Sequence, residues 1–76
     1  MIKRLLTEAE TVEFLESLGV DYTLAWLRKK RRVGGGIPYR KVDGSKIRYE
    51  RLTIERWLFE QPEFISTSDE SARRAA

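Results

Sequence analysis

The feature that most constrains the fold is the dipeptide Asp43-Gly44, which stands between two short segments of alternating apolar and polar residues. Asp-Gly in this setting is a strong signal for a tight β-hairpin, because both residues tolerate the positive φ angles of such a turn. The sequence therefore predicts a two-stranded ribbon made of residues 39–42 and 46–49. A lone hairpin is barely stable in water, so this ribbon must pack on helices.

The side chains of the ribbon divide into an apolar set and a basic set. The apolar set, which we expect on the inner face, is Tyr39, Val42, Ile47 and Tyr49. The basic set, which we expect to point outward, is Arg40, Lys46 and Arg48.

Helix signals lie on both sides of the ribbon. Thr7 and Glu10 have the spacing of a capping box, and they predict a first helix from about Glu8 to Leu18 that Gly19 ends. Asp21 is expected to cap a second helix, from Tyr22 to about Arg32.

A third helix is predicted from the spacing of Ile54, Trp57 and Leu58, with Thr53 as its cap. Pro62 bars its continuation. We expect residues 1–61 to form one α+β domain and residues 62–76, which are rich in serine, alanine and charge, to be a disordered tail.

Composition limits the chemistry. The 76 residues include no cysteine and no histidine, which removes disulfides, thiolate zinc sites and the usual general base. The acidic residues form no ligand-like cluster, and Gly34 to Gly36 lack the lysine-serine pair of a phosphate loop. We therefore expect no enzyme activity, no metal and no cofactor, and we interpret the three glycines as a linker.

No apolar run approaches the roughly 20 residues of a membrane span. The basic amino end is not followed by the apolar region of a signal peptide. We expect a cytoplasmic protein.

Positive charge is concentrated in the middle of the chain. Between Asp21 and Tyr49 there are nine Lys or Arg and two Asp, although the whole chain carries a net charge of only +3. The first predicted helix is acidic. This separation predicts a face that binds a polyanion and an opposite face turned to solvent.

The run Arg28 to Arg32 exceeds what a helix end needs to offset its dipole, so we expect phosphate contacts there. The early turns of this helix would approach base edges, and the ribbon would contact the minor groove or the backbone. The candidate DNA-binding residues are Tyr22, Thr23, Arg28, Lys29, Lys30, Arg31, Arg32, Arg40, Lys41, Lys46 and Arg48.

The aromatic residues admit two interpretations. They could form a stacking platform for single-stranded bases, but their spacing favours a shared core. The residues concerned are Phe14, Trp26, Tyr39, Tyr49 and Trp57.

Taken in order, these segments resemble excisionase-like, MerR-type winged helix-turn-helix domains over residues 5 to 59. The resemblance rests on Leu5-Leu6-Thr7-Glu8-Ala9-Glu10, Leu18-Gly19-Val20, Thr23-Leu24 with Trp26, Gly36-Ile37-Pro38-Tyr39-Arg40-Lys41-Val42, Ile47-Arg48-Tyr49 and Glu55-Arg56-Trp57-Leu58. The chain departs from the family at Leu52, where a polar cap is usual, and in the short connection between Val20 and Thr23.

The resemblance implies a winged helix-turn-helix fold of three helices and a two-stranded hairpin wing. It implies sequence-specific binding of double-stranded DNA, as an excisionase (a recombination directionality factor) or as a small transcription regulator of a phage or mobile element. Its partners would be DNA, a recombinase or further copies of the chain, in a prokaryotic cell or a phage-infected host. Two alternatives stay open: a protein-docking adaptor of the same fold, similar to a terminase small subunit or a recombinase-binding module, and an RNA-binding protein.

Overall fold

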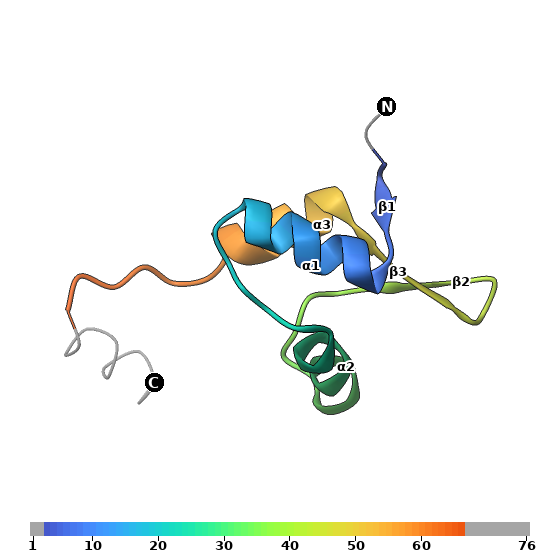
Figure 1. Ribbon diagram of the computed structural model, residues 1–76. Coiled ribbons are helices and arrows are strands. Elements are labelled where there is room, and N and C mark those ends of the chain that lie inside the picture. Colours follow the sequence, from blue (N-terminus) through green and yellow to red (C-terminus); the bar gives the residue numbers. More distant parts are fainter. Residues whose placement is uncertain (1–2, 67–76) are drawn as a thin grey trace.

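Three helices and three short strands make up the computed structural model, which describes residues 3–66 (Figure 1). The chain is thus a small α+β domain. In chain order its elements are β1 (Leu5–Leu6), α1 (Glu8–Ser17), α2 (Leu24–Val33), β2 (Arg40–Val42), β3 (Lys46–Glu50) and α3 (Arg51–Phe59).

The sheet is antiparallel and three-stranded, with β3 in the centre and the order β1-β3-β2. Leu6 of β1 lies opposite Tyr49, and Arg40 of β2 lies opposite Arg48. The prediction of a two-stranded ribbon was therefore incomplete. A strand of two residues is too short to show alternation in the sequence, and only its pairing with β3 defines it.

The predicted hairpin turn is confirmed. Asp43 and Gly44 adopt φ angles of 60° and 77°, and the Ser45 amide donates a hydrogen bond to the Val42 carbonyl at 3.3 Å. Asp43 is the one non-glycine residue with positive φ in the described part of the chain. The connection thus has the left-handed conformations that an Asp-Gly pair supplies most readily.

Helix α1 begins and ends close to where the sequence predicts. The Thr7 hydroxyl accepts a hydrogen bond from the Glu10 amide at 3.2 Å, and the Glu10 carboxylate accepts one from the Thr7 amide at 3.0 Å. These two bonds form the capping box. At the other end the helix stops at Ser17, and Gly19 has a φ of 96°.

The predicted starts of the other two helices were wrong. Thr23, not Asp21, caps α2: its hydroxyl accepts a hydrogen bond from the Trp26 amide at 3.1 Å. Helix α3 begins at Arg51, directly after β3, and Thr53 lies inside it. Asp21 and Thr23 are both good caps, so the sequence could not choose between them. At α3, the pairing of β3 with β1 carries the strand up to the helix.

The core takes one or more side chains from the sheet, from each helix and from the segment after α2. Tyr49, at the centre of the sheet, is its largest buried residue. The buried apolar residues are Leu6, Leu15, Leu27, Ile37, Tyr49 and Ile54. Of the predicted aromatic residues, Tyr49 belongs to this cluster, and Phe14, Trp26 and Trp57 pack against it while staying partly exposed, which fits the core interpretation. Tyr39 is 39% exposed, with its ring centroid 6.2 Å from that of Tyr49. Tyr22 stacks on Trp26 with ring centroids 3.7 Å apart, and Trp26 meets the edge of Trp57 at 6.0 Å.

The register of the hairpin corrects the predicted inner face. Side chains alternate along a strand, so Tyr39 and Val42, three residues apart, fall on opposite faces. Val42 lies on the same face as Arg40, together with the residues opposite them on β3, Arg48 and Lys46. Val42 is 39% exposed. The inner face instead carries Lys41, which lies opposite Ile47 and two residues along the chain from Tyr39.

Within residues 3–66, no helix is long and apolar enough to cross a lipid bilayer. Residues 61–66 are exposed and lie outside the helices and strands. The rest of the predicted disordered tail, residues 67–76, falls outside the described residues.

Candidate nucleic-acid interface

Helical geometry distributes the five cations of α2 over several sides of the helix. Ala25, Lys29 and Arg32 are spaced i, i+4, i+7, so they share the face opposite the buried Leu27. All three are exposed, and within residues 3–66 Lys29 and Arg32 take part in no ion pair. We call Ala25, Lys29 and Arg32 the outward face of α2.

Arg31 points the other way, toward the core. Its Nη1 atom donates hydrogen bonds to the Glu8 carboxylate at 3.0 Å and to the Tyr49 hydroxyl at 3.2 Å. The guanidinium also lies 5.8 Å from the centre of the Tyr39 ring. The sequence assigned Arg31 to phosphate contact, but these bonds join α2 to α1 and β3 inside the molecule.

Arg28 is intermediate between the exposed outward face of α2 and the inward-pointing Arg31. Its side chain is 62% exposed, and its Nε atom donates to the Glu8 carboxylate at 3.2 Å. Burial by itself would raise the pKa of Glu8, but the hydrogen bonds and charges of Arg31 and Arg28 outweigh burial and lower it. Glu8 therefore stays ionised and holds both arginines on the side of α2 that faces α1.

Lys30 has a packing role. A Cβ atom on Gly36 would lie 2.5 Å from the Cβ of Lys30, so the chain passes α2 at a distance that only glycine allows. The Lys30 ammonium lies 6.0 Å from the centre of the Trp26 ring. The glycine linker thus runs close along α2 and brings the hairpin back beside it.

The hairpin cations divide between its two faces. Lys41 lies on the face of Tyr39 and Tyr49, the face that Arg31 of α2 contacts. Arg40, Lys46 and Arg48 lie on the opposite face. We predicted that the hairpin cations form one polyanion-binding face with α2. The pleat of the ribbon instead places only Lys41 on the side that faces α2.

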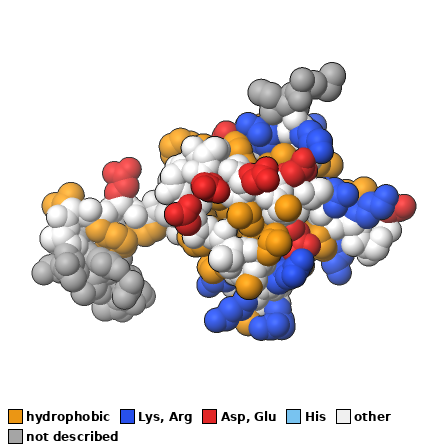
Figure 2. Space-filling view, viewed as in Figure 1, with side chains coloured by type: hydrophobic (Ala, Val, Ile, Leu, Met, Phe, Trp, Pro, Cys, Tyr) orange, Lys and Arg blue, Asp and Glu red, His pale blue; other side chains and the backbone are white. Residues whose placement is uncertain are grey.

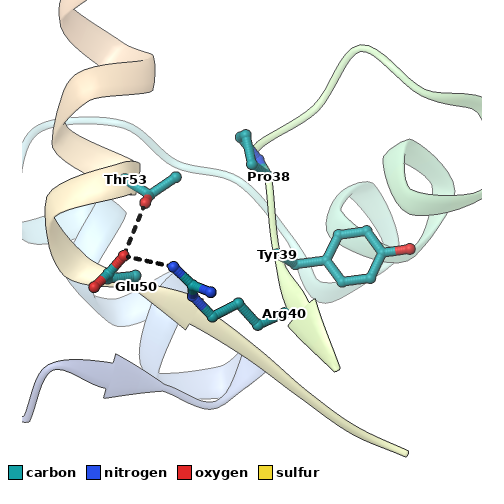
Figure 3. Close-up of a pocket in the computed structure, with 5 residues that line it drawn as sticks. All are labelled: Pro38, Tyr39, Arg40, Glu50 and Thr53. Carbon is teal, nitrogen blue, oxygen red and sulfur yellow. Dashed lines mark hydrogen bonds and ion pairs between the residues drawn. The ribbon is translucent and has the colours of Figure 1, made fainter. Parts of the chain in front are cut away.

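Two of the cations on the far face are engaged within the molecule. Arg40 reaches Glu50 at 3.5 Å, while the neighbouring Tyr39 points toward α2 (Figure 3). The Arg48 Nη1 atom donates to the Ile47 carbonyl at 2.7 Å. Lys46 stands next to the turn and, among the described residues, forms no ion pair.

Glu50 ties the base of the hairpin to its neighbours. It accepts from Arg4 at 2.6 Å and from the Thr53 hydroxyl at 3.3 Å, in addition to its contact with Arg40 (Figure 3). The hydrogen bond from Arg4 is the main cause of the lowered pKa of Glu50. This cluster fixes the direction in which the hairpin leaves the domain.

Tyr22 and Thr23 precede α2 instead of forming its first turn. Tyr22 stacks on Trp26, and the Thr23 hydroxyl is occupied by its capping bond. The outward residue nearest to the start of α2 is therefore Ala25. Lys3 and Arg4 were not among the predicted residues; they precede β1 and pair with Glu10 and Glu50. Because β1 left no sequence signal, neither position could be inferred.

In the face seen in Figure 2, charges of opposite sign gather over different elements. Lys and Arg side chains gather at the lower edge, where α2 lies, and along the projecting hairpin, which has an acidic side chain at its tip. Asp and Glu form a band over α1, with further Lys and Arg side chains above it near β1. Among residues 3–66, no group of three Asp or Glu side chains could hold a metal ion. What this arrangement offers chemically is a cationic helix face beside a cationic ribbon.

Comparison of the chain with protein-family models, curated proteins and solved structures finds no match.

Proposed function

We propose that this chain is a duplex DNA-binding module of the winged helix-turn-helix class. In this arrangement α1 and α2 form the helix pair, the β2–β3 hairpin is the wing, and α2 enters the major groove. The observation that carries the proposal is the outward face of α2, which is exposed and cationic and whose Lys29 and Arg32 form no ion pair with any residue from 3 to 66.

The composition of that face suits a groove-binding helix. An α-helix fits the major groove of B-form DNA, with side chains early in the helix nearest to the base edges. Ala25 is small enough to permit close approach, and an apolar methyl suits a thymine methyl. Arg28, one turn further along, would give up its bond to Glu8 to reach a guanine. Lys29 and Arg32 contact phosphates on either side.

The hairpin would extend this surface. Lys41 lies on the α2 side of the ribbon, and Lys46 stands at the turn, so these two cations meet the DNA backbone first. Arg31 and Arg40 instead join elements of the domain through the contacts described above, and Arg48 bonds to the carbonyl of its neighbour Ile47. Of the predicted DNA-binding residues, Arg28, Lys29, Arg32, Lys41 and Lys46 thus remain DNA contacts in the proposal. The others make contacts within the domain.

Two biological roles follow from the resemblance to excisionase-like domains. The module would bend or mark DNA for a recombinase, or it would occlude a promoter as a small transcription regulator. In both roles most of the affinity comes from counterion release at phosphates, so binding falls steeply as salt rises.

The test is a salt titration of binding to duplex DNA. Lys29→Ala and Arg32→Ala should each weaken binding to all sequences about equally and lower the salt slope by about one. Arg28→Ala should in addition relax sequence preference, measured by selection of bound duplexes from a random pool. Lys3→Ala, a lysine paired with Glu10 at the edge away from α2, is the matched control and should leave affinity unchanged.

Two results would refute the proposal. An absence of duplex binding at physiological salt would favour the protein-docking adaptor. Preferential binding of RNA in direct competition would favour an RNA-binding protein.

A further inference from the structure

Helix α3 carries two apolar side chains that the rest of the described chain leaves largely uncovered. Leu52 is 63% exposed and Phe59 is 88% exposed. They lie seven residues apart, which places them on one face of the helix, two turns from each other. Beside Phe59, a groove of about 430 Å³ is lined by Leu18, Glu55, Leu58 and Phe59.

Two opposite charges stand between these apolar residues. Glu55 and Arg56 follow Leu52 at i+3 and i+4, so all four side chains share one face. Neither charge takes part in an ion pair within residues 3–66. Along the helix this face therefore presents an apolar, an acidic, a basic and an apolar side chain, and we call these four residues the α3 stripe.

This order is complementary to itself when reversed. If a second copy of α3 packs antiparallel, with a two-fold axis between positions 55 and 56, each Leu52 lies against Phe59 of the other copy. Each Glu55 then lies against Arg56 of the other copy. Such an isologous contact uses the same patch twice and satisfies every member of it.

We propose that the α3 stripe is a dimerisation surface, on which a second copy of this chain docks with its own α3 antiparallel. The groove beside Phe59 receives Leu52 of the second copy. The contact is made by α3, whereas the cationic outward face belongs to α2, so self-association and DNA binding use different helices.

The expected dimer is weak. A contact centred on one nine-residue helix falls below the roughly 1,200 Å² that marks stable interfaces, so association requires high concentration. If the proposed DNA binding also holds, two copies on one duplex are held close together and the same contact strengthens. The preferred target is then an inverted repeat, because a two-fold dimer matches a two-fold site.

The test is made without DNA, by sedimentation equilibrium of the whole chain up to about 1 mM. The wild-type chain should show a reversible monomer–dimer equilibrium. Glu55→Arg alone and Arg56→Glu alone should each raise the dimer dissociation constant by about tenfold or more, since like charges then face each other twice. Mixing the two variants should restore association as a heterodimer, because each charge again meets its opposite.

Two further variants separate the α3 stripe from general surface effects. Phe59→Ser should remove the dimer. Val33→Ser, which alters an exposed apolar residue at the end of α2, should leave it intact. Circular dichroism confirms that each variant is folded.

The proposal is overturned if the wild-type chain stays monomeric over the whole range, if the charge variants dimerise like wild type, or if their mixture does not associate. Because no DNA is present, these outcomes are independent of the salt titration that tests DNA binding.

Discussion

The two sides of α2 differ in what surrounds chemically equivalent cations. Arg31 and Arg32 are neighbours in sequence, yet the Arg31 side chain is 19% exposed and bonded to Glu8 and Tyr49, while Arg32 is exposed and forms no ion pair within residues 3–66. The difference arises from a rotation of about 100° between consecutive helical residues. A run of like charges on a helix is therefore not one functional unit, and its members must be assigned by the face on which they lie.

The inward side of α2 depends on partners from other elements. Glu8 comes from α1 and Tyr49 from β3, so a single guanidinium joins three elements. On the outward side, Lys29 and Arg32 form no ion pair with another part of the described chain. It is therefore free to bind an external anion, and losing one of its cations leaves the domain intact.

The largest effect should come from the inward side. Leu27 is 1% exposed at the centre of the core. Leu27→Ala should lower the free energy of unfolding by about 2–5 kcal/mol, through lost burial and the cavity left behind. In a domain this small that loss could abolish folding, which thermal and urea denaturation would reveal. An unchanged melting temperature would mean that this side of α2 does not face the core.

A smaller effect should separate the two adjacent arginines. Arg31→Ala removes the donor to the Tyr49 hydroxyl and one of the two arginine donors to Glu8, and it should cost about 1–3 kcal/mol of stability. Arg32→Ala should change stability by less than about 0.5 kcal/mol, as is usual for exposed sites. Denaturant titration of both variants gives the comparison directly. Equal losses at the two positions would contradict the division of α2 into two sides.

The smallest effect should appear as a dependence on pH. The hydrogen bond from Lys3 is the main cause that lowers the pKa of Glu10 to about 2, and the pKa values of Glu8 and Glu50 are also lowered. Because these carboxyls titrate at 4.5 when unperturbed, their stabilising contribution is present above that pH and is lost as the pH falls through each lowered pKa, which is about 2 for Glu10. The melting temperature should decrease across that window. Glu8→Gln should make the decrease in melting temperature with falling pH smaller, whereas Arg32→Ala should leave the pH dependence of the melting temperature unchanged.

Much of the local structure could be predicted from residues that act on their immediate neighbours. The capping box of Thr7 and Glu10, the end of α1 at Gly19 and the Asp43-Gly44 turn all rest on hydrogen bonds or φ angles within a few residues. Their physics is local, and so the sequence alone identifies them. The same holds for the concentration of cations in α2 and the hairpin.

Other features depend on contacts between distant segments. Strand β1 exists only through its pairing with β3, and Thr23 caps α2 in a chain that offered Asp21 equally well. The role of Arg31 follows from Glu8, 23 residues away, and from Tyr49, 18 residues away. No pattern near Arg31 distinguishes it from Arg32, because burial of a side chain is set by what packs against it.

The amino-acid sequence by itself determined the class of secondary structure, the hairpin turn and the sign of the charge on each segment, since these depend on residue type and short-range geometry. Only the tertiary structure decided which cations face the solvent, which strands pair, and that, within residues 3–66, Leu52, Arg56 and Phe59 stay exposed on α3 beside the half-buried Glu55. Exposure and pairing are properties of the packed chain, because they depend on which distant surfaces exclude water from one another.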